Sequence, residues 1–313
     1  MNPAFSVIFL TTLIGAGQGL FLALFAAQIS LQFRALPAVP GTFYALGSLL
    51  AVALLALGLL ASFFHLGHPE RAWRAAVMWR TSWLSREVIV LPLTMLCVAG
   101  YGLVHFLAGG TASLALGGLG VLATAALFVC TGMIYACIRF LQEWASPLTL
   151  VNFTLLGSAS GFTLASAYAA WGAPALVEPF VFCAGALTLA ALATRTASLM
   201  RNARLRPKTT LQSAIGVRHP RIVQQAQGFM GGSFNTREFF HGRSSQWLRG
   251  VKWLFLVLVF PVPVLLLAAG LKQDLPLALC MAFLSQYIGL IAERWFFFAQ
   301  ANHPQNLYYQ TVG

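Results

Sequence analysis

Long, almost uninterrupted runs of apolar residues alternate with short polar connections along this chain. A run of about 20 apolar residues is long enough to cross the hydrocarbon core of a bilayer as a helix. The runs of this length are residues 4–29, 42–64, 87–107, 113–137, 149–170, 177–199, 250–271 and 277–299. The pattern predicts an all-α integral membrane protein, a single polytopic domain of eight transmembrane helices.

Composition agrees with the pattern. Hydrophobic residues make up 59% of the chain and charged residues only 8%, whereas a soluble domain carries about a quarter charged residues. Two stretches rich in glycine, residues 15–19 and 157–161, favour close approach of helix backbones. The first apolar run begins without a basic segment and is too long for a signal peptide, so we expect it to be a retained first helix.

The cysteines and histidines do not form a metal-binding pattern. All five cysteines lie in apolar runs and none forms a CxxC pair, so we expect no zinc site and no Fe–S cluster in this chain. A transmembrane haem would need two axial ligands that face each other. Only His65 and His105 lie in or beside the expected spans, at opposite ends of them, so no haem is expected either.

The distribution of charge predicts the topology. The net charge is +12, and the basic residues that produce it lie between the apolar runs rather than in a patch suited to nucleic acid. An even number of spans puts both termini on one side, here called side A, with the connections 65–86, 138–148 and 200–249. Side B holds only Arg34 and Lys272, which leaves 17 of the 19 basic residues on side A. By the positive-inside rule, side A and both termini are expected to be cytoplasmic.

The long connection 200–249 is basic and contains several aromatic residues. Loops of this length usually carry a function or are disordered, and the aromatic residues favour a docking surface over a flexible linker. The residues that we expect to contact a partner protein on side A are Arg74, Arg80, Arg86, Phe229, Phe234, Arg237, Phe239 and Phe240.

Few ionisable residues lie inside or at the edge of the spans, where each is a candidate for function. His65, Glu87 and Glu293 are all near side A, among aromatic residues. A quinone site needs an apolar slot, hydrogen-bond donors and a group that exchanges protons near neutral pH, as histidine does. The alternative is plain ion pairing, of Glu87 with Arg86 or Arg71 and of Glu293 with a basic residue nearby.

Four stretches resemble a known family. Residues 64–74, FHLGHPERAWR, and 79–88, WRTSWLSREV, resemble the membrane-anchor subunits of the dimethyl sulfoxide reductase type. Residues 228–242, GFMGGSFNTREFFHG, and 292–309, AERWFFFAQANHPQNLYY, resemble the sulfite-oxidising branch of that family. The resemblance covers essentially the whole chain.

The resemblance implies a bacterial inner-membrane protein that holds a molybdopterin catalytic subunit and a four-cluster Fe–S subunit against the membrane. Such anchors exchange electrons with ubiquinone or menaquinone and carry no haem. The family histidine near the quinone falls on His65, and Glu87 matches a position linked to quinone chemistry. Arg71 is expected to hold a quinone oxygen or the partner, whereas Glu293 is a candidate from its own position alone.

The leading hypothesis is therefore the anchor of a cytoplasm-facing complex that oxidises sulfite to sulfate. The main alternative is the anchor of an exported dimethyl sulfoxide reductase that oxidises menaquinol, which should invert the charge bias. A secondary transporter would instead place ionisable groups near the bilayer centre. A purely structural anchor would leave the quinone bound elsewhere.

Overall fold

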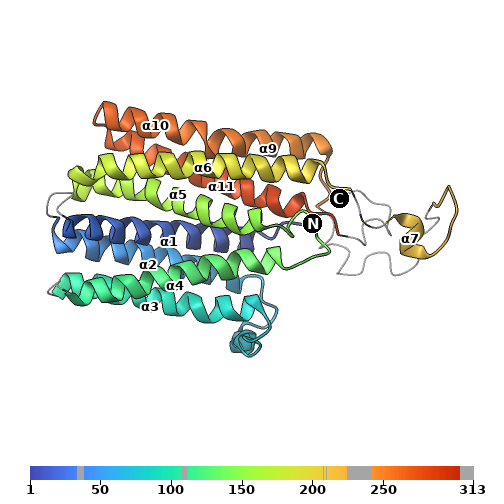
Figure 1. The fold of residues 1–313 in the computed structure, drawn as a ribbon, viewed down its shortest axis with the longest axis horizontal. Helices are drawn as coiled ribbons and strands as arrows, with labels where there is room; N and C mark the ends of the chain where they lie inside the picture. Colours follow the sequence, from blue (N-terminus) through green and yellow to red (C-terminus); the bar gives the residue numbers. More distant parts are fainter. Residues whose placement is uncertain (34–38, 108–110, 207, 209, 224–240, 304–313) are drawn as a thin grey trace.

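The computed structural model describes residues 1–33, 39–107, 111–206, 208, 210–223 and 241–303. Two successive groups of four spans lie side by side (Figure 1). The first group is α1 (Phe5–Gln32), α2 (Gly41–Phe63), α3 (Trp83–Leu107) and α4 (Thr111–Ala136). The second is α5 (Pro147–Gly172), α6 (Val177–Ala203), α9 (Ser245–Val259) with α10 (Pro261–Lys272), and α11 (Pro276–Ala299). Within the described residues, eight helical segments are therefore long and apolar enough to cross a membrane, as the sequence predicts.

The two glycine-rich stretches face each other where the groups meet. Helices α1 and α5 are the most buried spans and pack against each other. A Cβ atom added to Gly15 would lie 3.1 Å from the Cα of Gly157, and one added to Gly161 would collide with the backbone at Gly19. The expected close packing is confirmed, because a side chain at these positions would force the two helices apart.

The seventh span is broken into α9 and α10 at Phe260. Pro261 and Pro263 lack the N–H groups that would continue the helical ladder. Side chains of α11 bind carbonyl groups at the break: Gln286 Nε2 donates to Val259 (3.3 Å), whose helical donor would have been Pro263, and Ser285 Oγ donates to the neighbouring Leu258 (3.2 Å). The kink is thus stabilised from the neighbouring helix.

Two helices begin more than two residues earlier than the apolar runs suggest. Helix α3 starts at Trp83, before the expected start at residue 87, because Glu87 is buried inside the bundle rather than marking the membrane edge. Helix α9 starts at Ser245 rather than residue 250, because Ser244 Oγ accepts the backbone N–H of Trp247 and caps a polar first turn.

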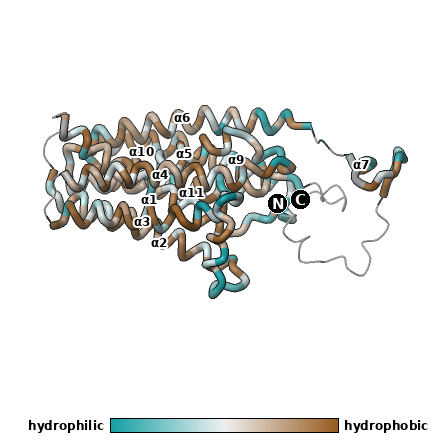
Figure 2. The backbone as a smooth tube through the Cα atoms, turned by 60° about the horizontal axis from the view of Figure 1, so that its bottom comes forward, coloured by the Kyte–Doolittle hydropathy of each residue, from teal (hydrophilic) through white to brown (hydrophobic). Residues whose placement is uncertain are grey.

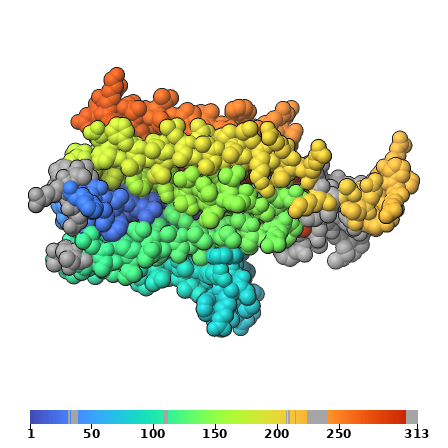
Figure 3. All heavy atoms as spheres, in the orientation of Figure 1, coloured from blue at the N-terminus to red at the C-terminus, as the bar shows by residue number. Residues whose placement is uncertain are grey.

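The connections of side A gather at one end of the bundle. The ammonium group of Met1 donates to the carbonyl of Ala301 (2.8 Å), so the described ends of the chain lie together, as expected for an even number of spans. Hydrophobic residues dominate the spans, while hydrophilic ones collect at this end and in the short helices η1 (Pro69–Ala76) and α7 (Leu211–Ile215) (Figure 2). The space-filling view shows η1 and its neighbours as a bulge on the flank of the bundle (Figure 3).

Candidate functional site

An apolar groove lies between α1 and α2, next to the expected quinone histidine. Its volume is about 280 Å³. It is lined by Ser6, Phe9, Leu57, Leu60, Ala61 and Phe64. His65 follows the last of these residues directly, just beyond the end of α2. Clefts lined mostly by apolar side chains are the usual place for small-molecule binding, so this groove is a candidate site.

The imidazole of His65 is available for proton exchange. Within the described part of the chain, its ring nitrogens make no hydrogen bond or ion pair. Partial burial lowers the pKa of His65 below its ordinary value, because desolvation disfavours the charged ring. The ring therefore favours the neutral form near pH 7 and is free to take up or release a proton.

Glu87 lies inside the first group of helices. Its side chain is buried and accepts a hydrogen bond from the hydroxyl of Thr131 on α4. Leu91 on α3 and Leu127 on α4 belong to an apolar cluster that also includes residues of α1 and α2. Since these leucines lie one turn farther from side A, the carboxyl group sits at the side A end of a dry helix interface.

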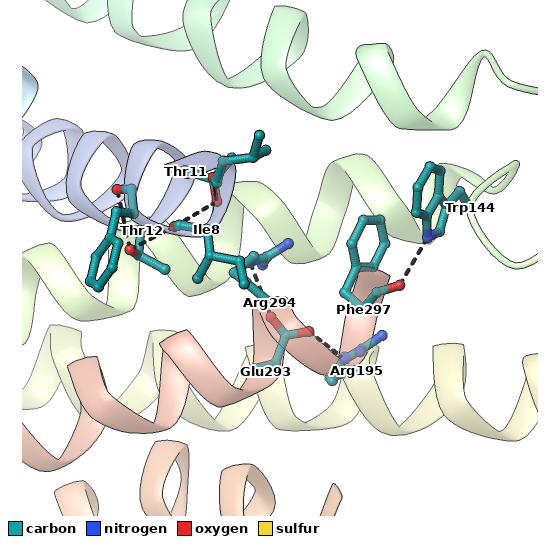
Figure 4. A network of polar contacts seen from close by, with 10 residues as sticks. Ile8, Thr11, Thr12, Trp144, Arg195, Glu293, Arg294 and Phe297 are labelled. Carbon is teal, nitrogen blue, oxygen red and sulfur yellow. Dashed lines mark hydrogen bonds and ion pairs between the residues drawn. The ribbon is translucent and has the colours of Figure 1, made fainter. Parts of the chain in front are cut away.

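Glu293 is held in a buried triad of charges (Figure 4). Its Oε1 lies 2.7 Å from Nε of Arg195 on α6, and its Oε2 lies 3.0 Å from Nε of Arg294. The side chains are 1%, 1% and 4% exposed in the order Glu293, Arg195, Arg294. Two guanidinium groups thus share one carboxylate, and the triad carries one excess positive charge when all three groups are ionised.

An aromatic cluster connects the triad with Glu87. The guanidinium group of Arg294 lies 3.7 Å above the ring of Phe153, which stacks on Tyr135. Tyr135 is close enough to both Glu87 and Arg294 to interact with each electrostatically. The indole of Trp144 in the α4–α5 connection donates to the carbonyl of Phe297 (2.9 Å; Figure 4), which fixes this connection on α11.

The three ionisable residues expected to form one constellation do not contact one another. Among the described residues, no hydrogen bond or ion pair joins any two of His65, Glu87 and Glu293. Glu293 forms ion pairs, as the alternative interpretation allowed. Its shorter contact is with Arg195 on another helix. Glu87 pairs with a hydroxyl group rather than with Arg86 or Arg71.

Arg195, the buried partner of Glu293, was not among the residues predicted from the sequence. Its signal was present, because an arginine inside the apolar run 177–199 is itself an ionisable residue at membrane depth. Thr131 and Tyr135 had no comparable signal, since a lone hydroxyl in an apolar run is common in helix packing.

The residues expected to contact partners have different settings. Arg86 donates to the carbonyls of Trp79 (2.9 Å) and Arg80 (2.8 Å), so it fastens the α2–α3 connection to α3. Arg71 lies 3.6 Å from Glu70 at the surface. Arg74 is exposed beside Trp73. The five from the long connection, Phe229, Phe234, Arg237, Phe239 and Phe240, lie outside the described residues.

No group of three or more His, Cys, Asp or Glu side chains placed to hold a metal ion occurs in the described ranges. The groove, the free imidazole and the buried polar residues all lie toward side A, whereas the aromatic contacts of His105 with Tyr44 and Tyr101 lie at the other end of α3. The eight apolar helices of the described residues are those of a membrane protein. Its polar groups gather at one end, which is suited to contact with a partner on that side.

Comparison with known proteins gives the class. The family model of the DMSO reductase anchor subunit (DmsC) matches residues 1–299, and the chain belongs to this family. It is a multi-pass membrane anchor of that type. Within the family, the chain is 58% identical, over 100% of both chains, to the C subunit of sulfite dehydrogenase from Allochromatium vinosum. The family resemblance of residues 64–88 is thereby confirmed, and so is the similarity to the sulfite-oxidising branch.

Proposed function

We propose that this chain is the membrane anchor and quinone-interacting subunit of a three-subunit molybdenum and Fe–S oxidoreductase that oxidises sulfite to sulfate. The name of its full-length relative supports the substrate. A molybdopterin catalytic subunit and a four-cluster Fe–S subunit would dock on side A, and electrons would pass to the quinone pool of a bacterial inner membrane.

The observation that carries the quinone role is the apolar groove beside His65. A quinone that is reduced takes up two electrons and two protons, and the electrons would come from the partner subunit. The groove would bind the apolar ring and tail, while His65 at its rim would supply a proton. Because the imidazole has no protein partner among the described residues, it is free to exchange that proton with water.

The other polar residues have supporting roles in this proposal. Glu87 would relay protons between the aqueous side and the helix interface, with Thr131 orienting its carboxyl group. Arg71, exposed in η1, would hold a quinone oxygen or the partner subunit. Glu293 would act indirectly, since both of its carboxylate oxygens are engaged by arginines and it holds α6 against α11.

Filling the groove tests the quinone role. The Ala61→Trp variant should raise the KM for quinone about tenfold or more, because the new ring occupies space between Phe9 and Phe64. The control is Leu49→Trp, an exposed position on the same helix outside the groove lining. If both variants keep the KM of the unmodified complex, quinone does not bind in this groove.

The family description also supports a second candidate, the anchor of a dimethyl sulfoxide reductase-type complex that oxidises menaquinol. The two candidates differ in which way side A faces. The 17 to 2 excess of basic residues favours a cytoplasmic side A and hence the sulfite-oxidising complex. A cysteine introduced at Arg218, which is exposed on side A, should be labelled by a membrane-impermeant reagent only after the cells are opened.

A further inference from the structure

The connection between α2 and α3, residues 64–82, projects sideways from the bundle. We call it the flank loop. It contains η1 and lies beside the first turn of α3, whereas the segment around α7 extends beyond the end of the bundle (Figures 1 and 3). The flank loop therefore lies beside the helices, near their side A ends, rather than beyond the end of the bundle.

Large apolar side chains of the flank loop are exposed. Their exposed fractions are 81% for Phe64, 67% for Trp73, 62% for Val77, 60% for Met78 and 52% for Trp79. Several large exposed apolar side chains in one connection suggest contact with a membrane or with another protein. Tryptophan at the edge of a membrane domain is typical of the headgroup region, where its ring is apolar and its N–H remains polar.

Two arginines of the flank loop have no acceptor. The guanidinium groups of Arg74 and Arg80 lie 5.5 Å and 5.2 Å from the ring centres of Trp73 and Trp79. Neither group makes a hydrogen bond or ion pair with any residue that the structure describes. The one carboxylate of the flank loop, Glu70, is already bound by His68 (3.0 Å) and Arg71 (3.6 Å).

We propose that the flank loop lies in the headgroup layer of the side A leaflet and binds an anionic phospholipid through Arg74 and Arg80. Each guanidinium group lies near the indole ring of the preceding tryptophan, and the phosphate supplies the acceptor that the protein does not. Val77 and Met78, between the two arginines in sequence, enter the upper acyl-chain region. A basic group at the membrane surface attracts anionic lipid in this way.

This placement changes the role expected for Arg74 and Arg80 from partner docking to lipid binding. The lateral position of the flank loop favours lipid, because a protein docked on the end of the bundle would lie beyond it (Figure 1). Phe64 belongs both to the flank loop and to the groove lining, so lipid binding would also hold the groove rim at membrane level. The inference itself does not depend on quinone binding.

Native mass spectrometry of the full chain in detergent micelles, titrated with phosphatidylglycerol or phosphatidylcholine, tests the proposal. The Arg74→Gln/Arg80→Gln double variant should bind phosphatidylglycerol about 10- to 30-fold more weakly, since each surface arginine contributes roughly fivefold. Phosphatidylcholine binding should change less than about twofold. The control is Arg218→Gln/Arg221→Gln, which removes the same charge from exposed positions near α7.

Three further outcomes are informative. If the double variant is poorly folded, each single variant should still show a loss of about fivefold. Unchanged phosphatidylglycerol affinity in the double variant would overturn the proposal. The same holds if the double variant keeps its lipid affinity but no longer assembles with the Fe–S subunit, because the flank loop would then be a protein-docking surface.

Discussion

Replacing Glu293 with glutamine should destabilise the bundle more than replacing Arg195 with methionine. The carboxylate lies between two guanidinium groups, 2.7 Å and 3.0 Å from their Nε atoms, and all three side chains are at most 4% exposed. Glu293→Gln leaves two buried positive charges without a counter-charge. Arg195→Met leaves Glu293 and Arg294 as a neutral pair, so the two variants change the buried charge in opposite directions.

The magnitudes follow from the geometry. Unit charges about 4 Å apart interact by about 4 kcal/mol at an effective dielectric constant of about 20. Glu293→Gln loses two such attractions, but the loss of free energy is partly offset because one fewer charge is desolvated. Breaking a buried ion pair costs about 3–5 kcal/mol in all. Arg195→Met should cost about 0–2 kcal/mol, since no uncompensated charge remains.

Thermal unfolding of the purified chain, followed by intrinsic tryptophan fluorescence, measures the difference. At about 2–4 °C per kcal/mol, Glu293→Gln should lower Tm by about 6–20 °C, and Arg195→Met should lower it less. Glu178→Gln removes a negative charge from an exposed position in α6 and should change Tm by only about 1–2 °C. Equal losses for the two triad variants, or the reverse order, would refute the charge argument.

Further predictions concern packing, the buried carboxyl group and pH. Gly161→Ala should cost about 1–3 kcal/mol of stability, whereas Gly118→Ala, which faces open space, should be nearly neutral, as thermal unfolding can test. Thr131→Val should cost about 1–3 kcal/mol, because it leaves the buried Glu87 without its donor; an unchanged Tm would contradict this. If His65 donates a proton to quinone, the rate should rise as the pH falls and level off below the ordinary pKa of 6.5, in a rate–pH profile that the His65→Gln variant should lack.

The spans were predictable because the physical demand on them is simple. A helix in lipid satisfies its own backbone hydrogen bonds, so an apolar run of sufficient length encodes it directly. Close packing at the two glycine-rich stretches was also expected from composition, whereas their contact with each other appears only in the structure. The start of α3 could not be predicted from the sequence. A glutamate at residue 87 indicates the edge of a span, and only the structure shows that its side chain is buried against Thr131.

The pairing inside the candidate site could not be read from the sequence. Arg195 and Glu293 are far apart in the chain, and their contact depends on how α6 and α11 are rotated and shifted against each other. Helix rotation is set by packing over the whole length of the spans rather than by local pattern. The groove beside His65 likewise arises from the fit of α1 against α2, which no motif records.

The role of His65 is tested most directly by two assays on the assembled complex, sulfite-driven quinone reduction and sulfite oxidation with a soluble artificial acceptor. The His65→Gln variant should lose about 100-fold or more of quinone reduction, as expected for a general acid or base, and keep the second activity. The His68→Gln control removes a nearby exposed imidazole that binds Glu70, and it should keep both activities. Quinone reduction at the unmodified rate in His65→Gln would contradict the assignment of the quinone site.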